Sequence, residues 1–236
     1  MAERILGLIG GVGPESTLDY YRRILDGYTA RRPGEHPRLL INSLNGGALF
    51  PAILGGDVEQ IAKVVRPAVA QVAAGGAGLG LICSVATHQA FELVADGSPI
   101  PLLSIIEATV NATQAAGAVH PALFAPRITA EGAFFERPFE RVGIELVRPA
   151  RADIEVVNDI YVNELVAGEF RPESRARLLA IFAGLRQDQG ADALILGGTE
   201  LSLLLPEPTY LGAPVLNAAA IHVDAALEWL VGGGPG

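Results

Sequence analysis

Strand-length apolar runs alternate with segments of helical period along almost the whole chain, and this alternation is the strongest constraint on its fold. Continuous apolar runs such as ILGLI, LGLI and ALIL are typical of parallel strands that are buried on both faces. The predicted strands cover residues 4–9, 38–43, 79–83, 102–105, 122–125, 144–147, 193–196 and 215–216. The predicted helices cover residues 15–31, 58–74, 87–95, 107–116, 130–142, 154–167, 173–189 and 218–230. This order predicts an α/β fold with mostly parallel sheets.

A coarse internal repeat suggests two similar halves. GAGLGLIC at residues 76–83 resembles GADALILGG at 190–198, and ILGLIGG near the start has a counterpart in PALFAP at 121–126. Ligands of parallel α/β sheets collect at the carboxyl ends of the strands, so two facing halves would share one active-site cleft. We therefore predict two pseudosymmetric α/β halves: residues 1–100 plus 210–236, which carry Cys83, and residues 101–209, which carry Gly198.

The composition excludes several classes of function. The net charge is −9 without any basic run, which argues against nucleic-acid binding. No apolar stretch reaches the ~20 residues that a membrane span needs, and the N-terminus enters a strand-like run without a signal-peptide pattern. The single cysteine rules out an intrachain disulfide, and no Cys/His cluster suggests a metal site. We expect a cytoplasmic protein with no metal and no membrane partner.

The glycine-rich stretch GLIGGVGPEST at residues 7–17 is a tight turn that opens a helix. Such a helix start can bind an anion, which raises the question of a dinucleotide site. However, Ser16 replaces the third glycine of the dinucleotide fingerprint, and Asn42 stands at the end of the next strand where an acidic ribose ligand is expected. A carboxylate-binding turn or a purely structural turn is the better interpretation.

Three further side chains are candidates for chemistry. Cys83 ends a predicted strand at the start of a helix, a position that can lower the pKa of a thiol, although a lone cysteine is equally often a small buried apolar residue. His88 and His222 could each orient a carboxylate or a thiolate, or could be structural. No Ser/His/Asp order and no nucleophile elbow is present, which disfavours a hydrolase triad.

These motifs together resemble the aspartate/glutamate racemase superfamily of cofactor-independent amino-acid racemases and their relatives. The resemblance covers nearly the whole chain, and GLIGGVGPESTLDYYRRI is its most specific stretch. INSLN, ICSVATH, NELVAGEFRPESR, GGTELSLLLPE and NAAAIHVDAAL follow the family pattern. In such enzymes one thiolate removes the α-proton and a second thiol protonates the opposite face, without pyridoxal phosphate or metal. The resemblance also implies a homodimer and a small, carboxylate-bearing substrate.

The chain departs from the family pattern at the second thiol. Where the family has GCTE, this sequence reads GGTE, with Gly198 in the place of the cysteine. Val85 and Ala86 stand near the places of the usual Asn and Thr beside the first cysteine, and Ala125-Pro126 replaces the usual Gly-Thr pair. Glycine has no side-chain proton to exchange, so ordinary two-thiol racemisation is disfavoured.

Three interpretations remain open. The first is a cofactor-independent isomerase or lyase that uses Cys83 alone, with Gly198 leaving room for a larger substrate. The second is an aspartate or glutamate racemase with a substitute second acid, and the third is a non-catalytic small-molecule-binding paralogue. The candidate catalytic residues are Cys83 and Thr199, and His88 and His222 are candidates for an orienting role. The candidate substrate-binding residues are Gly11, Asn42, Ser43, Ser84, Thr129, Gly198 and Glu200.

Overall fold

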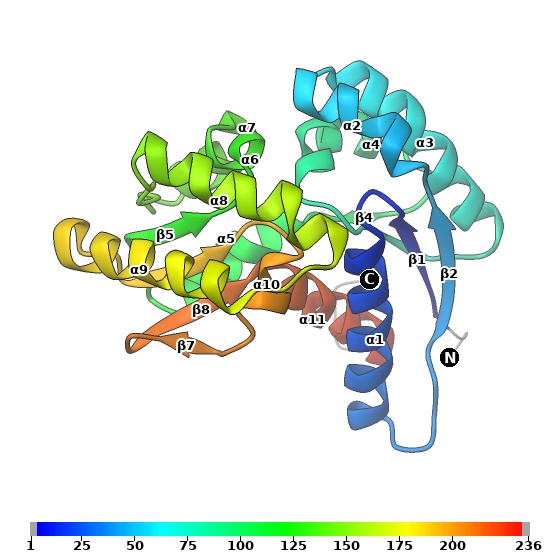
Figure 1. Ribbon diagram of the computed structural model, residues 1–236. Helices are drawn as coiled ribbons and strands as arrows, with labels where there is room; N and C mark the ends of the chain where they lie inside the picture. The colour runs from blue at the N-terminus through cyan, green and yellow to red at the C-terminus, as the bar shows by residue number, and fades with distance from the viewer. Residues whose placement is uncertain (1–3, 233–236) are drawn as a thin grey trace. The chain divides into compact units, whose positions relative to one another are not determined.

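The computed structural model describes residues 4–232, and it divides the chain into two compact units. The first unit comprises Met1–Ile105 with Ala219–Gly236, and the second comprises Ile106–Ala218. Each unit contains one sheet with helices packed on it, as predicted for an α/β chain (Figure 1). Within residues 4–232, no helix combines the length and the apolar character that crossing a membrane requires.

The first unit is built on a four-stranded sheet with the order β2-β1-β3-β4, in which all neighbours are parallel. Its strands are β1 (Ile5–Gly10), β2 (Arg38–Ser43), β3 (Leu79–Ile82) and β4 (Leu102–Leu103). Its helices are α1 (Pro14–Arg31), α2 (Gly46–Gly55), α3 (Val58–Ala74), the 3₁₀ helix η1 (Ala86–Ala90), α4 (Phe91–Ala95) and α11 (Ala218–Val231), while α5 (Ile105–Ala115) begins at the boundary of the two units.

The two faces of this sheet are covered by different helices. Side chains of α1 and α11 form one apolar cluster with alternate residues of β1, such as Leu6 and Leu8. Gly7 points to the other face, where α3 packs so closely that a Cβ at this position would lie 2.7 Å from the Val72 side chain. Each fully buried Leu or Ile in such a core contributes about 2 kcal/mol of hydrophobic stabilisation. The alternation along β1 therefore sets which face each helix covers.

The second unit holds the sheet β5-β6-β8-β7, in which β5, β6 and β8 are parallel and β7 is antiparallel. Its strands are β5 (Pro121–Phe124), β6 (Ala193–Leu196), β7 (Thr209–Tyr210) and β8 (Ala213–Asn217). Its remaining helices are α6 (Arg127–Ala130), α7 (Ala133–Glu140), α8 (Arg151–Asn163), η2 (Leu165–Ala167), α9 (Pro172–Gln189) and α10 (Leu201–Leu204). One apolar cluster joins β5 and β6 to α8, α9 and α10.

Several element predictions were wrong in detail. Residues 144–147 form no named strand: Val147 makes a single parallel bridge to Ala122, and Pro149 cannot donate a further ladder hydrogen bond. The predicted helix 130–142 is split into α6 and α7 at Gly132, and the predicted helix 154–167 ends at Asn163 before η2. The helix α2 was missed because three glycines and an internal proline weaken its sequence signal.

Candidate functional site

The carboxyl ends of β1, β2 and β3 meet at one edge of the first sheet. The register pairs Gly10 with Ser43 and places Ile9 between Asn42 and Ile82, so that Cys83 follows directly after β3 at this edge. The Cys83 N–H donates to the Ile9 carbonyl at 2.9 Å, which continues the ladder one residue beyond β3. The parallel register therefore brings the candidate residues of this unit to the same end of the sheet.

The Cys83 side chain lies inside the apolar core of the first unit. It is 1 % exposed and belongs to the cluster that α1 and α11 form over the sheet, and Ser16 Oγ donates to its carbonyl oxygen at 3.0 Å. Burial removes water from the thiolate and raises the pKa of the Cys83 thiol far above its usual range. Desolvation therefore outweighs any lowering of this pKa by the strand-end position, which the sequence had left open.

The glycine-rich turn after β1 is held mainly by backbone contacts. Gly11 adopts a positive φ of 82°, and a Cβ at this position would lie 2.3 Å from the Leu44 carbonyl oxygen. The Gly11 N–H already donates to Thr17 Oγ1 at 2.9 Å. The predicted use of this N–H as a carboxylate donor is therefore not supported, and the structure favours the structural interpretation of the turn.

The other candidate substrate-binding residues of this unit differ in whether their side chains are exposed, buried or already hydrogen-bonded. The Asn42 amide donates to the Gln71 side chain on α3, whereas Ser43 at the end of β2 is exposed. Ser84 is buried, and its carbonyl oxygen accepts hydrogen bonds from Thr87 Oγ1 and His88 Nδ1, both at 2.8 Å.

The two buried histidines bind backbone groups and a tyrosine. His88 Nδ1–H donates to Ser84, and its Nε2 accepts from the Ile105 N–H at 3.2 Å. His222 Nε2–H donates to the Leu103 carbonyl at 2.9 Å, and its Nδ1 accepts from the Tyr20 hydroxyl at 2.9 Å. Burial lowers the pKa of His88 to about 4 and, together with His88, that of His222 to about 3. Both rings are neutral, and each orients the chain near residues 103–105.

In the second unit, the turn after β6 carries a polar cluster in which the sequence candidates Thr199 and Glu200 are joined by Tyr161, a residue that the sequence did not reveal. Glu200 Oε2 accepts hydrogen bonds from Thr199 Oγ1 at 2.8 Å and from the hydroxyl of Tyr161, which lies on α8. Thr199 is 4 % exposed and Glu200 is 2 % exposed. Burial, and secondarily the negative charge of Glu200, raises the pKa of the Tyr161 phenol well above its usual value.

The space beside Gly198 is filled. A Cβ at this position would lie 2.6 Å from Tyr161 Cε2 and 3.0 Å from Pro126 Cδ. The expectation that Gly198 leaves room for a larger substrate is therefore wrong for the direction in which a side chain would point. Tyr161 itself was missed because it is 39 residues away from Glu200 and sits in an ordinary helical pattern.

Thr129 lies on the short helix α6, which follows β5 and Pro126. Its N–H donates to the Pro126 carbonyl at 2.8 Å, so it belongs to the same group of strand ends as Gly198. Thr129 is 1 % exposed, and its Oγ1 has no hydrogen-bond partner among the described residues. A buried hydroxyl without a partner is uncommon and suggests a place for a bound polar group.

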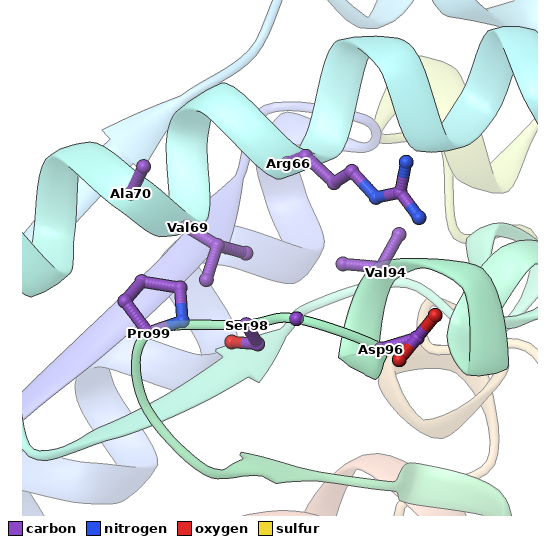
Figure 2. Close-up of a pocket in the computed structure, with 8 residues that line it drawn as sticks. Arg66, Val69, Ala70, Val94, Asp96, Ser98 and Pro99 are labelled. Carbon is purple, nitrogen blue, oxygen red and sulfur yellow. The ribbon is translucent and has the colours of Figure 1, made fainter.

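A surface hollow of about 410 Å³ lies elsewhere in the first unit and contains none of the candidate residues (Figure 2). It is lined by Arg66, Val69 and Ala70 of α3 and by residues of α4 and the segment 96–99. The Arg66 guanidinium donates to the Leu93 carbonyl. The cationic side chain in the described lining of this hollow therefore already has a backbone hydrogen-bond partner. Among the described residues, no three His, Cys, Asp or Glu side chains gather as metal ligands.

Known proteins resemble this chain over nearly its full length. The profile of the Asp/Glu/hydantoin racemase family matches residues 9–226. The structure of a proposed Asp/Glu racemase from Yersinia pestis is 30% identical, with a TM-score of 0.86 over 97% of this chain and 99% of that one. An aspartate racemase homologue from Pyrococcus horikoshii is 27% identical, with a TM-score of 0.81 over 98% of this chain and 100% of that one. An aspartate racemase from Picrophilus torridus, 20% identical with a TM-score of 0.77 over 97% and 94% of the two chains, shares the fold. The chain therefore belongs to the Asp/Glu/hydantoin racemase family.

Proposed function

We propose that this protein is a cofactor-independent isomerase or lyase that uses Cys83 as its one catalytic thiol on a small carboxylate-bearing substrate. The observation that carries the proposal is the asymmetry of the two strand-end turns. Cys83 follows β3 in one unit, whereas the turn after β6 in the other unit has Gly198 with the Tyr161 ring in the side-chain space. The names of the similar proteins, Asp/Glu racemase and aspartate racemase, support a substrate that is acidic at its α-carbon.

The proposed chemistry is proton transfer at that carbon. As a base, the Cys83 thiolate takes a proton, the C–H bond breaks, and its electron pair is delocalised into the substrate carboxylate. As an acid, the thiol S–H bond breaks and a new C–H bond forms at a carbanion, for example one left after loss of carbon dioxide. The raised pKa of the buried thiol supports the acid as the resting form. A thiolate formed in this apolar setting would be a strong base.

The polar groups at the strand ends are the proposed substrate contacts. In the second unit these are Thr129, whose buried hydroxyl has no partner within the described residues, and Thr199 with Glu200. In the first unit the exposed Ser43 and the buried Ser84 are better placed for this role than Gly11, whose N–H is already bound. Hydroxyl groups of this kind can stabilise an enolate-like intermediate.

Two alternatives have support of their own. An aspartate or glutamate racemase requires a substitute for the missing second acid, and the turn after β6 does carry hydroxyl and carboxyl groups. A non-catalytic small-molecule-binding protein is supported by the apolar packing around Cys83.

A solvent-exchange assay separates these alternatives. Amino acids, dicarboxylates and α,β-unsaturated acids are incubated with the protein in deuterated water, and deuterium on carbon is followed by NMR. We expect incorporation that Cys83→Ala and Cys83→Ser abolish. The matched control is Thr113→Val on α5, a buried substitution that removes a hydroxyl donating to the Thr109 carbonyl within the same helix. Activity that survives Cys83→Ala would disprove the thiol mechanism, and binding without any exchange would favour the binding protein.

A further inference from the structure

A chain of buried hydrogen bonds joins three elements of the first unit around Cys83. The Tyr20 hydroxyl on α1 donates to His222 Nδ1 on α11, and His222 Nε2–H donates to the Leu103 carbonyl at the end of β4. Both distances are 2.9 Å, and the Tyr20 and His222 side chains are fully buried. Buried polar networks of this kind hold the elements that they join in one arrangement. α1, α11 and the end of β4 are therefore tied together by side chains.

A second histidine holds the residues that follow β4. Backbone N–H groups in the first turn of a helix cannot be satisfied by the helix itself. The N–H of Ile105, the first residue of α5, donates to His88 Nε2 at 3.2 Å. On its other side, His88 Nδ1–H donates to the carbonyl of Ser84, the residue directly after Cys83. His88 thus ties the start of α5 to the turn that carries the thiol.

The segment held in this way, residues 103–105, lies beside Cys83. β3 and β4 pair Leu81 with Leu103, so the same parallel register places Cys83 level with Ile105. Alternate residues of a strand share one face of the sheet, and Leu81, Cys83 and Leu103 do pack in the one apolar cluster that α1 and α11 cover. The segment is therefore one wall of the cluster that encloses the thiol.

We propose that Tyr20, His222 and His88 form a clamp that keeps residues 103–105 closed against Cys83, and that release of this clamp is the motion that exposes the thiol. Cys83 is 1 % exposed, so an external molecule reaches its sulfur only after the cluster opens. The use of this opening by a substrate rests on the proposed function of Cys83. The clamp residues bind one another and the backbone, so they are positioning residues that act through the thiol.

Thiol labelling tests the clamp without any substrate. Cys83 is the single cysteine of the chain, so a thiol reagent reports on this residue alone. Methyl methanethiolsulfonate, which is small and uncharged, is added at several urea concentrations below the unfolding transition, and mass spectrometry measures the labelling rate. Local opening exposes little surface and depends weakly on urea, whereas labelling through global unfolding rises steeply with urea. We expect a wild-type rate that is nearly independent of urea in this range.

Variants of the clamp should raise this urea-independent rate. Tyr20→Phe keeps the ring in the cluster and removes the hydroxyl, so we expect the rate to rise about fivefold, as for the loss of one buried hydrogen bond. His222→Leu removes both hydrogen bonds of the ring and should raise the rate by at least ~10-fold. His222→Gln retains an N–H donor for the Leu103 carbonyl, and its rate should lie between those of the wild type and His222→Leu.

Tyr28→Phe is the matched control. Tyr28 lies on the same helix as Tyr20 and packs against the same apolar cluster, but it is not a member of the clamp. We expect this variant to label within about twofold of the wild type.

The same variants are then measured in the solvent-exchange assay. The apparent affinity for a substrate falls in proportion to the fraction of molecules that are competent to bind it. Tyr20→Phe should therefore raise kcat/KM for Cys83-dependent exchange by about fivefold, the same factor as the labelling rate. A tyrosine with a merely structural role would give no such gain.

The possible failures are distinguishable. If Tyr20→Phe and His222→Leu leave the urea-independent labelling unchanged, or if wild-type labelling follows global unfolding, the clamp is overturned and the proposed function of Cys83 is untouched. If labelling rises but kcat/KM does not, the substrate does not enter by release of the clamp, and this role is overturned. If labelling rises as expected but the wild type shows no Cys83-dependent exchange with any compound, the clamp stands and the proposed function fails.

Discussion

The substitution Gly198→Cys tests most directly what the structure adds to the sequence. From the sequence alone, this change would restore the second thiol of the family. In the structure the new Cβ would lie 2.6 Å from Tyr161 Cε2 and 3.0 Å from Pro126 Cδ. Because real Cβ atoms essentially never come closer than 3.0 Å to another heavy atom, the Tyr161 ring or the backbone at residue 198 would have to move. Gly198 is not in the left-handed region, so the cost is steric and not conformational.

The cost follows from this overpacking. Forcing extra atoms into a filled space costs about 1–3 kcal/mol, so we expect Gly198→Cys to lower the free energy of unfolding by that amount. Tyr161→Ala truncates a half-buried ring and should cost about 2 kcal/mol on its own. In the double variant the cysteine occupies part of the space that the ring leaves. The combined loss should therefore be smaller than the sum of the single losses by at least ~1 kcal/mol.

Urea unfolding under reducing conditions measures the free energy of unfolding of the wild type, of the two single variants and of the double variant. Gly184→Cys on α9 is the matched control: the same substitution meets no atom within 4 Å, so the stability should stay within about 0.5 kcal/mol of the wild type. We also expect Gly198→Cys alone to give no aspartate or glutamate racemisation. Wild-type stability of Gly198→Cys, or strict additivity with Tyr161→Ala, would refute the placement of the Tyr161 ring in the side-chain space.

Three further predictions follow from the burial of individual groups. Cys83 should react with iodoacetamide at pH 8 far more slowly in the folded protein than in urea, because burial raises its pKa; equal rates would contradict this burial. His88 and His222 have folded pKa values of about 4 and about 3, below the unfolded value of 6.5, so the unfolded chain binds more protons between these limits. Stability in urea should therefore decrease as the pH falls below about 6.5, and a flat profile down to pH 4 would show that these rings are not desolvated. Thr129→Val should leave the free energy of unfolding unchanged or raise it by up to about 1 kcal/mol, because the buried hydroxyl lacks a partner within residues 4–232. The same substitution should weaken substrate binding. A clear loss of stability would instead reveal a hydrogen bond to that hydroxyl.

Homodimerisation and a cytoplasmic location stay predictions of the sequence. Light scattering of the purified protein measures the first, and cell fractionation measures the second.

The sequence by itself determined the α/β class, the order of the main elements and the position of Cys83 after a buried strand. These features depend on local periodicity and on the rule that parallel strands end at one edge of a sheet, so a single chain contains enough information. The bounds of β2 and β6 were predicted to the residue because both strands have sharp polar or glycine boundaries.

Only the tertiary structure decided the properties of the candidate site. The contact between Tyr161 and the turn at Gly198 joins residues of two separate elements, and no periodic pattern encodes which side chain of α8 meets that turn. The raised pKa of Cys83 likewise depends on α1 and α11 closing over the sheet, which the position of a thiol along the strand does not specify. Solvation and side-chain packing are set by elements distant in the sequence. For this reason the sequence could identify the missing thiol, whereas the structure was needed to find the phenol that fills its place.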